Sequence, residues 1–342
     1  MNEYKEFNNV KFDIDNYEEV NVNKALIKSS VKSNLNKINN KYKKVLVATI
    51  SGLVIAGGLF TFRQPVYANI YKVMYDIKYA LGIEFNLDEY KTVVGKSISE
   101  NGLTITLNEV ILDEDELIVS TTYKYDKELK HEYISCDPVI YVNGKSTMLS
   151  GYGNAIATDK NTTERVITYR LEESLKSDID IKLVYLNPTY FENNKENVIK
   201  GRWQFKFKIS SDELAIDTKT MDLNESFDLG EDETMTLKKY RTNILGTKII
   251  YNRKIHNDED IFYDIKLVGK DDLGNDVEFY LKSTNDKEGK LIFNKLDKNL
   301  NEKATKLTLT PYAAKQANTG NKMNSNFKQI GEEFVIDLNK LK

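Results

Sequence analysis

The chain has 342 residues, of which 40% are hydrophobic, 11% aromatic and 30% charged, so it is long enough for about two domains and too hydrophobic for wholesale disorder. A net charge of −3 provides no overall basic excess, which argues against direct binding to nucleic acid. The single cysteine, Cys136, cannot form an intramolecular disulfide, and the two histidines, His131 and His256, are too few for a multi-histidine metal site.

Residues 1–44 are predicted to form a short helical tail that folds on a partner, because so short a segment cannot bury a core of its own. Apolar residues recur at helical spacing from Ile27 to Tyr42, and hydrophobic residues alternate with acids from Phe7 to Val20. Such a stripe is typical of a docking peptide; the alternative is a basic helix that lies on anionic lipid head groups. The residues predicted to bind the partner are Phe12, Ile14, Tyr17, Ile27, Val31 and Leu35.

A transmembrane helix is predicted at residues 45–62, which contain no charged side chain. At 1.5 Å per residue this helix covers roughly 27 Å, close to the thickness of the hydrocarbon core of a bilayer. Residues 24–44 carry seven lysines and no acid, so the positive-inside rule places the N-terminus in the cytoplasm and the C-terminal part outside the cell. The prediction is therefore a single-pass protein of the cell membrane.

The same segment has a second interpretation as a secretory signal peptide. Val66-Tyr67-Ala68 resembles a cleavage site with small residues, and the basic stretch before the apolar span suits an n-region. The length of both parts argues against this, because an h-region ordinarily has about 7 to 15 residues. A cut after Ala68 would separate the tail from the external part, so this alternative decides the function.

The external part is predicted to be mainly β. Residues 63–91 are expected to form a juxtamembrane amphipathic helix, which ends near Gly82, and a linker. Two tandem Ig-like β-sandwich domains are expected to follow, at residues 92–211 and 212–342. Period-two patterns predict strands in the first of these domains at Leu103–Leu107, Leu117–Tyr125, Val139–Val142, Arg165–Leu171, Ile179–Leu186 and Trp203–Ile209.

The strand plan is predicted to occur twice. A pair of strands at Leu103–Leu107 and Leu117–Tyr123 is echoed at Met235–Leu237 and Thr247–Tyr251. Each half also ends with a strand, a proline near a tyrosine, a loop and a final strand led by glycine, at Gly201 and Gly331 respectively. These correspondences predict two related modules in tandem, with Trp203 and Phe205 in the core of the first.

No catalytic, cofactor-binding or metal-binding residue is predicted, and the protein is not expected to be an enzyme. The acids at 113–116 and 271–276 crowd oxygen atoms into turns, but neither run matches the twelve-residue calcium loop, so solvated turn acids are the default and weak Ca²⁺ binding is the alternative. Gly144-Lys145-Ser146 lacks the first glycine of a phosphate loop and is expected to be a hairpin turn. Cys136 is expected to be a buried, inert thiol.

The acidic-hydrophobic start, the lysine-rich helix, the apolar span, the exit Pro65–Ile70 and the strand Asn101–Leu107 together resemble the DUF4179 family of Firmicutes membrane proteins. The C-terminal half looks like the DUF5643 Ig-like module. This resemblance implies a Gram-positive anti-sigma factor whose tail binds a sigma factor of the extracytoplasmic-function type. The tail lacks the His/Cys motif of zinc-type anti-sigma domains, so the expected contact is metal-free.

The resemblance implies that an external signal ends the inhibition, although the sequence does not identify its ligand. Because a single helix transmits conformational change poorly, release by cleavage is expected: a site-1 protease would cut near residues 63–92, and a site-2 protease within the span, where Gly57-Gly58 weakens the helix. The rival hypothesis is an anchored or secreted surface protein whose two Ig-like modules bind cell wall, glycan or another protein.

Overall fold

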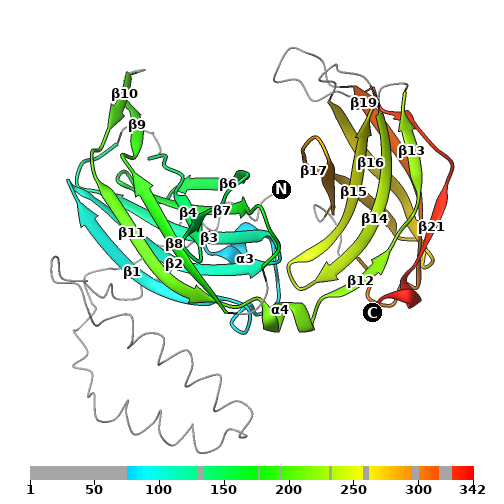
Figure 1. Ribbon diagram of the computed structural model, residues 1–342, viewed down its shortest axis with the longest axis horizontal. Coiled ribbons are helices and arrows are strands. Elements are labelled where there is room, and N and C mark those ends of the chain that lie inside the picture. The colour runs from blue at the N-terminus through cyan, green and yellow to red at the C-terminus, as the bar shows by residue number, and fades with distance from the viewer. Residues whose placement is uncertain are drawn as a thin grey trace, which may run out of the picture. The chain divides into compact units, whose positions relative to one another are not determined.

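The computed structural model describes residues 75–129, 134–175, 178–192, 195–230, 233–256, 262–294, 300–315 and 326–342, all within one compact unit, Phe62–Lys342. These residues are mainly β, as predicted (Figure 1). No helix in the described part of the chain has the length and apolar character needed to cross a membrane. The tail at residues 1–44 and the predicted span at residues 45–62 lie outside the described residues.

The first module consists of two stacked sheets and a small hairpin. A five-stranded sheet has the order β1-β2-β3-β7-β6, a four-stranded sheet the order β11-β8-β4-β5, and β9 pairs with β10. All these pairings are antiparallel. The strands are β1 (Thr92–Glu100), β2 (Leu103–Asp113), β3 (Glu116–Tyr125), β4 (Val139–Val142), β5 (Lys145–Ser146), β6 (Ser150–Ala157), β7 (Thr162–Arg170), β8 (Ile179–Leu186), β9 (Thr189–Glu192), β10 (Lys195–Val198) and β11 (Arg202–Ile209).

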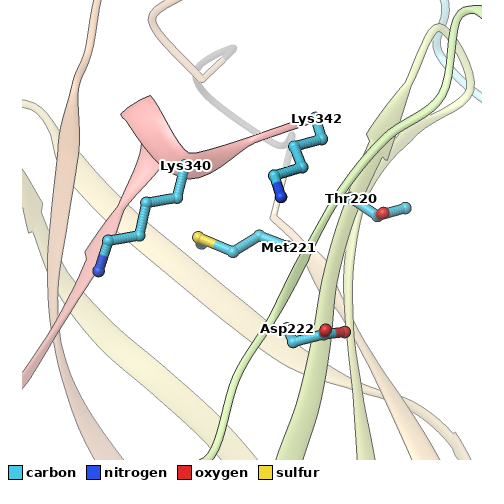
Figure 2. A pocket seen from close by; sticks show the side chains of 5 residues that line it. All are labelled: Thr220, Met221, Asp222, Lys340 and Lys342. Carbon is cyan, nitrogen blue, oxygen red and sulfur yellow. The ribbon is translucent and has the colours of Figure 1, made fainter.

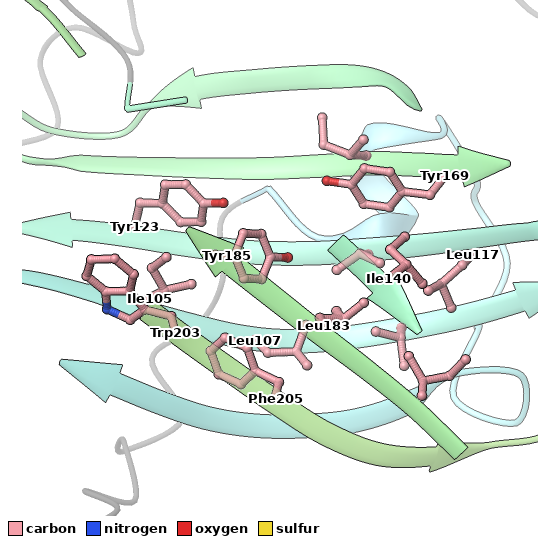
Figure 3. Close-up of a cluster of buried hydrophobic side chains, with 14 of the residues drawn as sticks. Ile105, Leu107, Leu117, Tyr123, Ile140, Tyr169, Leu183, Tyr185, Trp203 and Phe205 are labelled. Carbon is pink, nitrogen blue, oxygen red and sulfur yellow. The ribbon is translucent and has the colours of Figure 1, made fainter. Parts of the chain in front are cut away.

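The core of this module lies between the two sheets. Figure 3 shows aromatic and aliphatic side chains from β2, β3 and β7 facing those from β4, β8 and β11. Trp203 and Phe205 are fully buried there, which confirms their predicted place, and the indole Nε1 of Trp203 donates a hydrogen bond to the carbonyl of Leu103 at 3.1 Å. Burial of a large aromatic ring is among the strongest contributions to stability that one side chain can make.

The six strands predicted in this half correspond to β2, β3, β4, β7, β8 and β11. Five strands were not predicted, namely β1, β5, β6, β9 and β10. β1 contains a bulge between Val93 and Lys96, and β6 contains two glycines, so neither shows a clean apolar alternation. The hairpin turn predicted at Gly144-Lys145-Ser146 lies one residue earlier: Asn143 and Gly144 have the positive φ of a tight two-residue turn, and Lys145 and Ser146 form β5.

The second module follows a short link formed by α4 (Asp212–Ile216). It differs from the expected pair of separate sheets, because hydrogen-bonded pairing continues through ten strands. The two ends of this sheet meet: Thr220 and Lys342 exchange backbone hydrogen bonds, and the rings of Phe227 and Phe334 are 5.4 Å apart. The strands are β12 (Lys219–Asp222), β13 (Ser226–Leu229), β14 (Glu233–Asn243), β15 (Gly246–Ile255), β16 (Tyr263–Asp271), β17 (Asp276–Thr284), β18 (Glu288–Phe293), β19 (Lys306–Lys315), β20 (Lys328–Gln329) and β21 (Phe334–Asp337), followed by the 3₁₀ helix η4 (Leu338–Lys340).

The repeated plan is visible in the strand pairing. Hairpins β2–β3 and β14–β15 both begin with an 11-residue strand, and the register shifts at the same position of each, after Leu107 and after Leu237. In both modules the strand led by the glycine pairs with the strand that carries the proline and tyrosine motif at or after its end, β11 with β8 and β21 with β19. The two modules therefore share their first hairpin and their last strand pair.

Candidate functional site

The tip of the β2–β3 hairpin concentrates four carboxylates on a two-residue turn. Asp113 ends β2, Glu116 begins β3, and Glu114 between them has a φ of 57°, which the turn requires. The side chains of Asp113 and Glu116 are almost completely buried. Because a buried charge without a partner is very costly, these carboxylates need cations beside them.

The cations come from the equivalent hairpin of the second module and from β18. Arg241 donates from Nη1 to Asp113 at 3.0 Å, and its Nη2 pairs with the other oxygen of the same carboxylate. Lys248 Nζ lies 2.7 Å from both Asp113 and Glu116. Lys290 Nζ lies 2.9 Å from Asp115 and 3.0 Å from Glu116.

Further contacts widen this ion-pair network, which we call the module junction. Arg170 at the end of β7 pairs with Asp115 at 3.3 Å and with Glu288 of the second module. The hydroxyl of Tyr152 on β6 donates to Glu116 at 3.2 Å, and the Lys282 ammonium lies 4.5 Å from the centre of the Tyr152 ring. The junction thus joins β3, β6 and β7 to strands of the second module.

Charge pairing controls the titration of the buried groups. Burial alone would raise the pKa of Glu116, but the Lys248 and Lys290 ammoniums outweigh it and lower that pKa to about 2. Burial also opposes the charge on Asp113, and Lys248 and Arg241 lower its pKa below the ordinary value. For Lys248, burial acts to lower the pKa, whereas Glu116 and Asp113 raise it above the usual range. The junction is therefore held as ions at neutral pH.

A second element of the site is the connector, which we define as residues 75–91, directly before β1. It contains the short helix α3 (Ile77–Ala80), capped by the side chain of Asp76, and it turns at Gly82, where φ is +61°. This fits the predicted end of the juxtamembrane helix, although α3 is shorter than expected within the described residues. The other residues of the predicted apolar face, Ile70, Val73 and Met74, lie outside them.

The connector is attached to the outer face of the five-stranded sheet, opposite the core. Glu164 accepts a hydrogen bond from the backbone N–H of Tyr75 at 2.6 Å, and Glu109 accepts one from Ile77 at 3.0 Å. Lys91 at the other end of the connector pairs with Glu109 at 3.0 Å. The carboxylate of Glu109 thus ties both ends of the connector to β2.

Apolar contacts join the connector to both modules. A separate cluster of buried side chains contains residues of the connector, of the outer face of β2, β3 and β7, and of α4; they are Tyr75, Ile77, Ile83, Leu87, Ile111, Ile118, Val166 and Leu214. Ile244 and Leu245, the turn of the β14–β15 hairpin, pack against it. The Tyr90 hydroxyl also donates to Asp217, just after α4, at 2.5 Å, and this bond together with burial raises the pKa of Tyr90 to about 12.

This arrangement is suited to mechanical coupling. In the described part of the chain, no group of three or more His, Cys, Asp or Glu side chains is placed to hold a metal. The acids at 113–116 are engaged by lysine and arginine, and Asp271 accepts hydrogen bonds from Leu273 and Asn275 within its own turn, so neither turn matches the weak Ca²⁺ alternative. Cys136 is half-buried where it was expected to be buried, and this burial raises the pKa of its thiol, which disfavours the reactive thiolate.

A surface hollow of about 370 Å³ lies between β12 and the C-terminus (Figure 2). It is lined by Thr220, Met221, Asp222, Lys340 and Lys342. Figure 2 shows the side chains of Lys340 and Lys342 on one side of the hollow and that of Asp222 on the other.

The residues predicted to bind a partner, Phe12, Ile14, Tyr17, Ile27, Val31 and Leu35, all lie outside the described residues. Sequence reasoning missed the cations Arg241, Lys248 and Lys290. A separate signal concerned the connector: the three consecutive apolar residues from Val110 to Leu112 break the period-two alternation of β2, and all three are buried. A strand that is apolar on both faces must be covered on both, and here the connector supplies the second cover.

Two family models match this chain, one in its N-terminal half and the other in its C-terminal half. The model "Domain of unknown function (DUF4179)" matches residues 37–125, which include the connector and the β2–β3 hairpin, and "Family of unknown function (DUF5643)" matches residues 218–338. A solved structure titled "The crystal structure of the conserved domain protein from Bacillus anthracis" is similar in fold, with a TM-score of 0.56 and 19% identity over 74% of this chain and 93% of that one. The curated proteins gave no match. The chain therefore carries a DUF4179 domain followed by a DUF5643 domain.

Proposed function

We propose that the protein is a single-pass membrane anti-sigma factor. Residues 1–44 bind a sigma factor of the extracytoplasmic-function type at the inner face of the cell membrane, residues 45–62 span the bilayer, and the two β modules respond to a signal outside. The observation that carries this proposal is the connector, which follows the predicted span in the chain and contacts both modules. A sensor must be physically joined to the segment that leads into the membrane, and in this proposal the contacts of the connector with both modules provide that joint.

The contacts of the connector define how a signal would reach it. Leu214, Ile244 and Leu245 belong to the link and the second module, yet they pack on the cluster that buries Ile77. Separation of the modules would remove these side chains and the Tyr90–Asp217 hydrogen bond, so the connector would lose part of its apolar cover. A loosened connector would then be open to a site-1 protease, and cleavage within the span at Gly57-Gly58 by a site-2 protease would free the tail.

The test of the tail is co-purification with the candidate sigma factor. Full-length protein carrying Ile27→Asp and Val31→Asp is expected to lose the sigma factor, since both changes place a charge on the apolar stripe. The matched control is Ser29→Asp with Ser33→Asp, which adds the same charge at the same four-residue spacing on another face of the helix. The control is expected to bind as the wild type does.

Two results would contradict the proposal. Equal recovery of the sigma factor with the stripe variant and the control would remove these contact residues from the binding site. Mature protein that begins at Asn69 in unstressed cells would show that the tail and the sensor are separated, as the hypothesis of a secreted surface protein requires.

A further inference from the structure

We propose that the open edge of β6 pairs with β6 of a second copy of this chain, in antiparallel orientation, so that two five-stranded sheets become one sheet that crosses a homodimer. In the described part of the chain β6 is the last strand of its sheet and pairs with β7 alone, through eight residues from Ser150 to Ala157 (Figure 1). Most residues along it are exposed. Its outer backbone N–H and C=O groups are therefore available to another strand.

β6 lacks the features that usually protect a sheet edge. It contains neither a charged residue nor a proline, whereas every other strand that ends a sheet in the described part of the chain carries at least one charged side chain. The uncharged run extends over residues 146–158 in a chain that is 30% charged, and it includes the exposed side chains of Met148 and Leu149. Charges on edge strands prevent pairing between molecules, so their absence here points to an edge that does pair.

The glycines of β6 keep its backbone close to β7. A Cβ atom at Gly153 would lie 2.1 Å from the carbonyl oxygen of Val166, and one at Gly151 would lie 2.9 Å from the ring of Tyr169. A side chain at either position would push the strand away from the sheet. These glycines therefore hold the edge strand in regular register, which a partner strand requires.

The occupant that fits this edge is a second copy. In an antiparallel strand pair with a two-fold axis, the strand faces an identical strand of the second copy. Any charge on it would lie near a like charge, and a strand without charge avoids this repulsion. The two-fold axis of such a pair is perpendicular to the sheet, so the outer faces of both copies point the same way. Both connectors lie on that face. Given the membrane anchor of the proposed function, both chains could then enter the same membrane.

The second module contacts β6 near one end of the strand. The contact is made by Lys282 at Tyr152, in the N-terminal half of β6. Antiparallel pairing brings the C-terminal half of one β6 beside the N-terminal half of the other. The two second modules consequently lie at opposite ends of the strand pair.

The first experiment is disulfide cross-linking of the full-length protein in membranes, with Cys136→Ser as background. Single cysteines at Ser150, Asn154 and Ala157, which are exposed on β6, are compared with Val93→Cys on β1, the opposite edge of the same sheet. At least one β6 cysteine is expected to give a product of twice the chain mass under mild oxidation, and Val93→Cys is expected to give none. No β6 product above the Val93 level, or a product with a different protein, would overturn the proposal.

The second experiment measures mass in detergent as a function of concentration. Asn154→Lys is expected to raise the dissociation constant of the dimer at least tenfold, because two like charges meet across the axis. Val93→Lys adds the same charge to the opposite edge and is expected to leave the dimer intact. A monomeric wild type at all concentrations, or equal dissociation constants for the two variants, would refute the pairing. Neither readout involves the sigma factor, so failure here is distinct from failure of the proposed function.

Discussion

Asp113 and Arg241 form an ion pair whose side chains are 1% and 2% exposed, so almost no water screens it. Pairs of this kind need not stabilise a fold relative to apolar side chains of the same size, but removal of one partner leaves a buried charge behind. Lys248 shares the Asp113 carboxylate and would compensate only in part. The junction is therefore sensitive to the loss of any one of its cations.

Arg241→Leu is expected to lower the free energy of unfolding by about 3 kcal/mol, because the buried Asp113 carboxylate loses its bidentate ion pair with the guanidinium. The measurement is urea unfolding followed by circular dichroism. Lys270→Leu provides the control, since Lys270 and its partner Asp276 are 65% and 71% exposed and their pair should contribute less than about 1 kcal/mol. Equal effects of the two substitutions would show that the buried pair has no special role.

Acid should weaken the junction through Glu116. Its pKa is lowered from 4.5 to about 2, so the unfolded state binds a proton on this group at a higher pH than the folded state does. The stabilisation from this carboxylate is thus fully present above about pH 4.5 and is lost as the pH falls toward 2. The stability difference between wild type and Glu116→Gln is expected to be constant from pH 5 to 7 and to shrink below pH 4.5, in unfolding curves recorded at each pH. A difference that does not change with pH would contradict the assignment.

At the scale of elements, the connector is the segment whose attachment can be tested alone. Ile77 and Leu87 are buried in its apolar cluster, whereas Tyr79 on the same segment is 69% exposed. Ile77→Asp is expected to detach the connector and expose it to added trypsin at Lys78 and Lys91, while the buried Trp203 keeps its fluorescence. Cleavage sites are read by mass spectrometry, with Tyr79→Asp as the control of equal charge. Unchanged protection in Ile77→Asp would show that this contact does not hold the connector.

The sequence predicted those elements in which one face is buried and the other exposed. The alternation in β8 and β11 identified both strands, which the structure pairs with each other. The pattern failed where both faces of a strand are buried, as at the end of β2. It also failed in β6, where glycines let the backbone lie close to β7. In both cases the deciding contact comes from a segment distant in the chain, which a local pattern does not record.

The candidate site was predicted only in part, for the same reason. The acids at 113–116 were visible as a cluster, but their default reading as solvated turn acids was wrong for Asp113 and Glu116. Their partners Arg241 and Lys248 are more than 120 residues away in sequence. The internal repeat was the one feature of the sequence that related the two segments, because it identified the β2–β3 and β14–β15 hairpins as equivalent.

At the scale of the whole molecule, two related hairpins meet with opposite charge. The tip of β2–β3 presents carboxylates, and the corresponding ends of β14 and β15 present Arg241 and Lys248. The opposite charge on the two hairpins lets the modules recognise each other in one orientation, with Asn243 and Gly246 of the second module standing where the first has Asp113 and Glu116. Apolar packing at Ile244 and Leu245 then joins the same junction to the connector. Charge thus supplies specificity, while the apolar cluster links the junction to the connector.

Reversal of charge on the second module should therefore separate the two modules without unfolding either. Lys248→Glu with Lys290→Glu places two acids against Asp115 and Glu116, and the resulting repulsion is expected to raise the radius of gyration of residues 75–342 in X-ray scattering. The control, Lys208→Glu with Lys270→Glu, changes the net charge equally at exposed positions and should leave the radius unchanged. Circular dichroism should remain that of a β protein in both. If the junction variant keeps the radius of the wild type, apolar packing alone holds the modules together, and a signal would have to act on that cluster instead of on the ion pairs.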